Sequence, residues 1–208
     1  FKRKTDPRYI IDHPREEDIP ELVDLYSRFY LTYKLAPKMD ENLFRYYLNE
    51  IEGMDLENMW VARENGKIKA VLCSWDENVY KRYRVLTIPL SMKILFGIVR
   101  FLSVFMKMPA SISPGQSLKQ KTLVMLAHDQ DIDALSTLIR HVNNIHLGGA
   151  YTVLQTHFHK DDEMIRAQKG LLSFKLDIEA HMMTTDSDLA EEIAGTPGPV
   201  LLEWPMYI

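Results

Sequence analysis

The sequence predicts a mixed α/β fold, a mostly antiparallel sheet with helices on both faces. Apolar residues recur at three- and four-residue spacing in several segments, which is typical of amphipathic helices. Asn65-Gly66 joins two apolar runs within 59–75, as in a two-residue antiparallel hairpin. The predicted strand 118–127 is followed by a helix and a further strand, and such a right-handed crossover makes one strand pair parallel.

The individual elements follow from local signals. Asp18 is the predicted N-cap of the first helix, with Pro20 in its first turn, and the apolar stripe of that helix continues to Tyr33. Gly53 is the predicted end of the second helix. In chain order we expect a strand at 8–13, helices at 18–33 and 40–53, the hairpin at 59–75, an apolar helical insert at about 86–108, a strand at 118–127, a helix at 131–147, a strand at 150–159, a helix at 161–170, a strand at 173–185, an acidic helix at 186–195 and a strand at 200–208.

The apolar insert is unusual because a narrow basic face runs along it. Lys93, Gly97, Arg100, Val104 and Lys107 recur at spacings of four and three. The apolar run is too short to cross a bilayer as a simple span. We expect this helix to be buried against the sheet or against another domain, as most apolar helices are. The alternative is an interaction helix over 90–108 that binds a partner or a membrane surface.

The composition excludes some classes of protein. Of 208 residues, 46% are hydrophobic and 26% charged, which is a globular rather than a disordered composition. The net charge of -4, with no long run of one sign, argues against nucleic acid as a partner. Cys73 is the only cysteine, so no internal disulfide can form; a buried thiol in a reducing cytoplasm is expected. The chain begins with Phe1, which suggests a fragment of a longer protein.

Several segments together resemble the GNAT family of acetyl-CoA-dependent N-acetyltransferases. They are PREEDIPELVDL, WVARENGKIKAVLCSW, TLVMLA, YTVLQTHFH and DDEMIRAQKGLLSFKLD, in that order. The layout is similar to the C-terminal half of tandem GNAT proteins of the HOOKLESS type. The resemblance implies a single GNAT-like domain over 1–208, acetyl-CoA as cofactor and a small-molecule or peptide amine as acceptor. It also implies a preceding GNAT domain, or a second copy of the chain, as partner, and no membrane.

The resemblance places the coenzyme A pyrophosphate at residues 128–133, where family members carry a Gln/Arg-x-x-Gly-x-Gly/Ala loop. Here the loop reads His-Asp-Gln-Asp-Ile-Asp and contains no glycine. Carboxylates there would occupy the N–H groups of the helix N-terminus and repel a diphosphate. The simpler interpretation is that the acids cap the helix. Both interpretations predict a domain that is degenerate in coenzyme A binding.

Three consecutive residues are the candidate site residues implied by the resemblance. Leu126 and Ala127 lie on the expected cofactor-binding strand, and His128 ends that strand where an acetyl group would sit. A neutral imidazole could accept a proton from an amine, which makes His128 the candidate catalytic base. The alternative is a loop histidine that bonds to the backbone.

A second family feature is missing. GNAT enzymes often carry a tyrosine general acid on the fourth helix, but DDEMIRAQKG has none, and Lys169 or Arg166 lies near the expected place. An ordinary lysine or arginine holds its proton near neutral pH. The resemblance therefore implies a half that supports acceptor binding or domain pairing rather than the chemistry.

A metal site is the remaining alternative. His157 and His159 share one strand face at spacing two, with Asp161 or Asp162 nearby. No third ligand follows at a recognisable spacing, so we expect a polar strand end and no metal.

Overall fold

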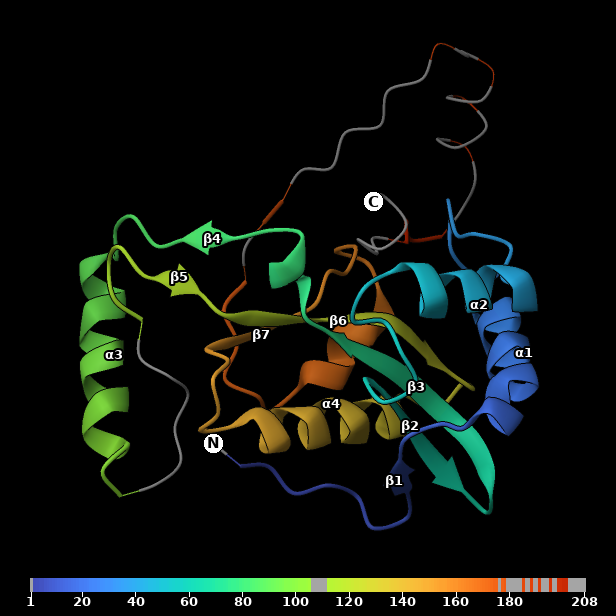
Figure 1. Ribbon diagram of the computed structural model, residues 1–208, viewed down its shortest axis with the longest axis horizontal. Coiled ribbons are helices and arrows are strands. Elements are labelled where there is room, and N and C mark those ends of the chain that lie inside the picture. The colour runs from blue at the N-terminus through green and yellow to red at the C-terminus, as the bar shows by residue number, and fades with distance from the viewer. Residues whose placement is uncertain are drawn as a thin grey trace.

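Five strands form one open, mostly antiparallel sheet in the order β1-β2-β3-β6-β7, as the sequence predicts for a mixed α/β fold (Figure 1). The computed structural model describes residues 2–105, 112–175, 177–178, 185, 188, 191, 195 and 198–201. Only the β6–β7 pair is parallel. The strands are β1 (Ile10–Asp12), β2 (Met59–Glu64), β3 (Lys67–Trp75), β6 (Gln120–His128) and β7 (Val153–Gln155).

Helices cover both faces of this sheet. Helices α1 (Ile19–Tyr30) and α2 (Glu41–Glu50) lie on one face. Helix α4 (Ile132–His146) and the 3₁₀ helix η3 (Glu163–Gln168) lie on the other. The predicted helices 40–53 and 131–147 are confirmed within a few residues, because their apolar spacing matches the face that they bury.

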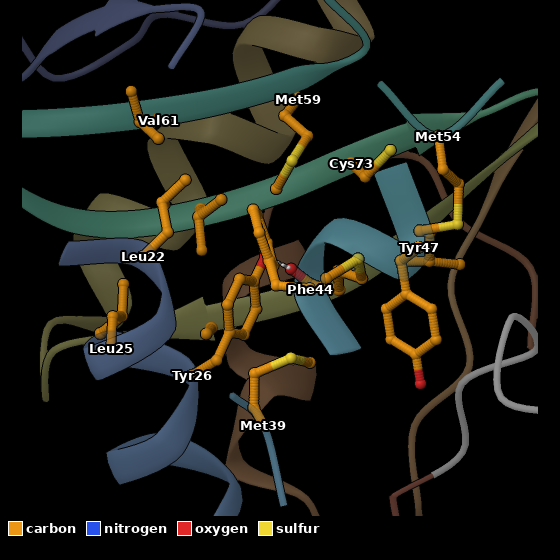
Figure 2. Packing of buried hydrophobic residues seen from close by; sticks show 14 of the residues in the cluster. Leu22, Leu25, Tyr26, Met39, Phe44, Tyr47, Met54, Met59, Val61 and Cys73 are labelled. Atoms are coloured by element: carbon orange, nitrogen blue, oxygen red, sulfur yellow. Dashed lines mark hydrogen bonds between the residues drawn. The ribbon is translucent and has the colours of Figure 1, made fainter. Parts of the chain in front are cut away.

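The core beneath α1 and α2 is aromatic and rich in sulfur. Tyr26 of α1 and Phe44 of α2 are fully buried and lie 5.8 Å apart between ring centroids. Figure 2 shows them beneath the sheet, together with Met59 and Cys73. Cys73 is a buried free thiol, as expected. Burying side chains of this size stabilises a fold by about 1.5–3 kcal/mol each.

The core beneath α4 is aliphatic. Leu135, Leu138 and Val142 of α4 are fully buried and pack against Leu72 and Leu126 of the sheet. Strand β6 contributes to both cores, since Leu123 and Leu126 lie in the core beneath α4, whereas Val124, Met125 and Ala127 lie in the core beneath α1 and α2.

One local prediction is confirmed at the level of single residues, and α2 has a side-chain cap that was not predicted. Asn65 and Gly66 have φ of 52° and 79° between β2 and β3, as a two-residue hairpin turn requires. Asp40 caps α2, accepting a hydrogen bond from the Leu43 N–H at 2.8 Å.

The first helix begins as predicted, with Asp18 as N-cap residue and Pro20 in its first turn, but its capping bond and its end differ from the prediction. The Asp18 side chain does not cap α1 but accepts from the Arg15 N–H and from the Arg63 guanidinium, each at 2.7 Å. The reason is that Asp18 ends the 3₁₀ turn η1 (Glu16–Asp18), which already leads into the helix. The helix ends at Tyr30, and Tyr33 lies in the turn beyond it.

The predictions for the C-terminal third are only partly met. The strand expected at 150–159 is limited to β7, and the helix expected at 161–170 is η3. Of the strand expected at 173–185, the described residues are not in a strand, and the rest lies outside the described residues. The acidic helix 186–195 also lies largely outside them. Of the last strand, Val200 forms a parallel bridge with Lys34.

The apolar insert is the largest departure from expectation. Its helix α3 (Leu90–Leu102) stands at one end of the molecule beside a two-stranded ribbon, β4 (Tyr83–Arg84) and β5 (Ser117–Leu118) (Figure 1). It makes no extensive contact with another described element, so the expected burial against the sheet is wrong. Within the described residues, no helix has the length and apolar character needed to cross a membrane.

A bulge interrupts the central strand β6. Val71 faces Ala127 while Cys73 faces Val124, so β6 contains one residue more than β3 over this stretch. Met125, with φ of 51°, is in the left-handed region, which costs a side chain other than glycine about 1–2 kcal/mol. The Tyr26 hydroxyl donates to the Met125 carbonyl at 2.6 Å and holds the bulge from α1.

We predict that Tyr26→Phe destabilises the fold by about 1–2 kcal/mol, because it leaves the buried Met125 carbonyl without its phenolic donor. Urea unfolding followed by circular dichroism measures the change. The matched control is Tyr46→Phe on the exposed side of α2, which should change the free energy of unfolding by less than about 0.5 kcal/mol. Equal effects of the two substitutions would contradict this account of the bulge.

Candidate functional site

The candidate site lies where β6 and β7 separate. The two strands are paired only through Gln120–Thr122 and Val153–Gln155. Beyond Thr122, β6 continues through its bulge to His128, and no strand of the described chain pairs with that edge. The start of α4 follows at once, so the end of β6, the loop 129–131 and the first turn of α4 meet at one place (Figure 1).

A buried polar cluster holds the paired part of these strands together. Glu77, in the 3₁₀ turn η2 (Glu77–Val79), is fully buried, and its Oε1 accepts from the side-chain amides of Gln120 and Gln155. The Gln155 amide also donates to Thr122 Oγ1 at 2.9 Å. Glu77 Oε2 has no hydrogen-bond partner among the described residues. The cluster fixes the register of the parallel pair, and no spacing in the sequence indicated it.

The two predicted cofactor-binding residues are core residues by their side chains. Leu126 is buried against α4, whereas Ala127 is buried in the core beneath α1 and α2. Because their side chains point to opposite faces, only main-chain atoms of these two residues could contact a ligand at the edge of β6.

His128 differs from its neighbours because it is a half-buried polar group at the end of the strand. It lies opposite Ala70 of β3, and its ring centroid is 5.0 Å from that of Phe29. Its Nδ1 is buried and has no hydrogen-bond partner among the described residues. Burial lowers the pKa of His128, although the carboxylates of Asp131 and other neighbours act in the opposite direction. The imidazole is therefore neutral near pH 7.

Asp129, the first acid of the loop, forms ion pairs with two basic side chains. The Asp129 carboxylate accepts from Arg28 Nη1 at 2.7 Å and from Lys69 Nζ at 3.1 Å. The Arg28 hydrogen bond, followed by that of Lys69, lowers the pKa of Asp129. Gln130 follows with φ of 53°, a left-handed conformation that usually favours glycine. Asp129 thus ties α1 and β3 to the loop and does not cap α4.

The second acid occupies the N-terminus of α4. Asp131 is the N-cap residue, and its Oδ1 accepts from the Ala134 N–H at 3.1 Å. The Tyr9 hydroxyl reaches both carboxylate oxygens at 3.0 and 2.9 Å. Asp133, by contrast, is exposed and lies 3.7 Å from Arg8. The prediction of capping acids is confirmed for Asp131 alone, whose carboxylate accepts from an N–H group in the first turn of α4.

A tyrosine does lie beside η3, although that helix contains none. The Tyr33 hydroxyl donates to Asp162 Oδ1 at 3.0 Å, and Asp162 also accepts from the Met164 N–H at 2.8 Å. Burial raises the pKa of Asp162. Arg166 and Lys169 are exposed on the outer side of η3. The sequence analysis missed Tyr33 because this tyrosine comes from the segment after α1 and not from residues 161–170.

The two candidate metal ligands lie beyond the end of β7, not on a strand face. His159 pairs locally with Asp161, with 3.7 Å between Nδ1 and Oδ2, whereas His157 is half-buried. Across the residues that the structure describes, no group of three or more His, Cys, Asp or Glu side chains could hold a metal ion.

The comparisons with known proteins identify no relative. No protein-family model matches the chain, and none of the curated proteins matches it.

We predict that Asp131→Ala lowers the free energy of unfolding by about 1–2 kcal/mol, because it removes the cap of α4 and the acceptor of the Tyr9 hydroxyl. The matched control, Asp133→Ala in the same helical turn, should cost less than about 0.5 kcal/mol because that carboxylate is exposed. Thermal and urea unfolding measure both. A larger effect at Asp133 would mean that the cap is assigned to the wrong acid.

A second prediction concerns pH. Burial, with a smaller effect of Lys81, lowers the pKa of His157 from 6.5 to about 4. Between these two values the unfolded chain binds a proton that the folded chain does not, so stability falls as the pH falls through this window. We expect His157→Asn to reduce the loss of stability between about pH 7 and pH 5 by about 1–2 kcal/mol.

Urea midpoints of the wild type and of His157→Asn at both pH values give the measurement. The remaining slope belongs partly to His128, whose pKa is lowered in the same direction. Identical pH dependence in the two proteins would show that His157 is not a source of the effect.

Proposed function

We propose that this chain is a GNAT-type domain that has lost its own coenzyme A site and supports acceptor binding or domain pairing in a tandem N-acetyltransferase. The sheet order supports the family assignment. Three antiparallel pairs lead to a single parallel pair, β6–β7, with helices on both faces and a bulge in the strand that leads into α4. From β1 to η3 the order of helices and strands, apart from the β4–β5 ribbon, agrees with the element order on which the resemblance rests, and this agreement supports the proposal.

The filled N-terminus of α4 is the observation that carries the proposal. A diphosphate needs main-chain N–H groups that point at it and a net positive field. The Ala134 N–H is already bound to Asp131, and the negative charge of that carboxylate faces the place where the phosphates would lie. Repulsion between two charges a few ångströms apart costs about 1–4 kcal/mol in a partly solvated site. The residues present at 128–133 therefore do not fit the pyrophosphate of coenzyme A.

The acids in the loop at 128–133 stabilise the fold by linking the loop to other elements. Asp131 joins the start of α4 to Tyr9, which precedes β1, and Asp129 joins the loop to α1 and β3. A loop built in this way is a rigid joint between elements rather than an open cradle. We assign no proton transfer to His128 in this half, because its neutral imidazole has no cofactor beside it to serve. In the tandem protein, the preceding GNAT domain would carry acetyl-CoA and the chemistry.

Isothermal titration calorimetry of the chain with acetyl-CoA tests the loss of the site. We expect no binding at concentrations up to about 1 mM, which corresponds to less than about 4 kcal/mol of binding free energy. A dissociation constant in the micromolar range would overturn the proposal, because it would require the loop to accept a diphosphate despite its carboxylates.

The tandem arrangement is tested separately by the coding sequence upstream of Phe1. A GNAT domain there with an intact glycine loop, and acetyl transfer by the whole protein, would support it. An upstream sequence of unrelated character would remove the basis for domain pairing while leaving the calorimetric result unaffected.

A further inference from the structure

The exposed face of α3 is a surface that the proposed function does not explain. Its apolar side chains follow one another at spacings of four, four, three and four, which brings them onto a single stripe of the helix and of the turn after it. Between 51% and 74% of each is exposed. The stripe consists of Leu90, Ile94, Ile98, Phe101 and Phe105.

The charge around this stripe is of one sign. Residues 78–128 contain eight Lys and Arg and no Asp or Glu, whereas the remaining 157 residues contain 17 Lys and Arg and 29 Asp and Glu. A chain with a net charge of -4 is therefore divided into a basic segment of +8 and a remainder of -12. Such a division concentrates a positive field around α3 and its ribbon.

Four of the eight basic side chains are exposed on α3 or on and beside β4. Lys93 and Arg100 are exposed on α3 itself, seven residues apart and thus on one side of the helix. Arg82, Tyr83 and Arg84 are exposed on or beside β4. Figure 1 shows α3 with the β4–β5 ribbon at one end of the molecule and α1 with α2 at the opposite end.

We propose that α3 and the β4–β5 ribbon form a docking surface for an anionic lipid bilayer. The apolar stripe would enter the boundary between headgroups and acyl chains, with the helix in the plane of the membrane. Lys93 and Arg100 would reach the anionic headgroups from the side of the helix while their stems stay on apolar surface. Tyr83 would lie at the same level, where aromatic side chains are favoured.

Two observations favour lipid over a protein partner. Ser91, Lys93 and Arg100 are the polar residues in the sequence of this helix, and an otherwise apolar helix suits a hydrocarbon surface better than a patterned protein face. The complete absence of acid over 51 consecutive residues matches a uniformly negative surface rather than the mixed charges of a protein. The proposal does not depend on the GNAT assignment.

Co-sedimentation of the whole chain with vesicles tests the proposal. We expect binding to phosphatidylcholine vesicles that contain about one third phosphatidylserine, and a marked loss of binding when the salt rises from about 0.1 M to about 0.5 M. Lys93→Gln with Arg100→Gln should weaken partition by about 30-fold, since each base is worth about fivefold near an anionic surface. Ile94→Ser with Ile98→Ser should weaken it by at least roughly tenfold.

The matched control for charge is Lys38→Gln with Arg45→Gln. This double variant also removes two positive charges, but near α2 at the opposite end of the molecule. Its partition onto anionic vesicles should stay within about twofold of that of the wild type. Circular dichroism confirms that each variant is folded. Absence of sedimentation with anionic vesicles, equal binding to neutral vesicles, or equal losses in test and control variants would overturn the proposal. So would self-association or capture of a protein through α3 in a chain that does not bind anionic vesicles.

Discussion

The structure depends on strand β6, which must satisfy two hydrogen-bonded neighbours and two packed faces at once. It pairs antiparallel with β3 and, for three residues only, parallel with β7. The extra residue at its bulge breaks the regular pairing there, and the left-handed conformation of Met125 is stabilised by the Tyr26 hydroxyl from the opposite helix. Without that support the conformation would cost about 1–2 kcal/mol with nothing to offset it. The bulge lies between the end of the β6–β7 pairing at Thr122 and His128, which ends the strand before the loop into α4.

Two aspartates in the loop after β6 have different structural roles. Asp129 and Asp131 are only two positions apart, yet one neutralises Arg28 and Lys69 and the other caps α4. Both are satisfied inside the fold, so neither needs an external cation. A helix N-terminus that is capped from within gains stability and loses its capacity for anions, because the same N–H groups cannot do both. In the proposal, the cap that stabilises α4 is therefore also the interaction that prevents coenzyme A from binding.

Sequence reasoning succeeded where the signal was local. The turn at Asn65-Gly66 and the stripe of α4 each depend on residues close in the chain, and each was predicted. It failed where partners come from distant segments. Tyr33 reaches Asp162 across 129 positions, and Tyr26 reaches Met125 across 99, so no spacing rule reveals either contact. The Glu77 cluster, which joins three elements, was invisible for the same reason.

The predicted burial of α3 against the sheet was wrong for a different reason. A strongly apolar helix predicts burial, and the hydrophobic effect does require that its surface leave water. It does not specify what covers the surface. An isolated helix of 13 residues is marginal in water, and α3 gains no extensive packing from the sheet. In the proposed complex, an external apolar surface supplies the free energy that the described part of the chain does not. A segment that carries eight bases and no acids favours a negatively charged one, so the exposed stripe and the charge division are two parts of a single physical argument.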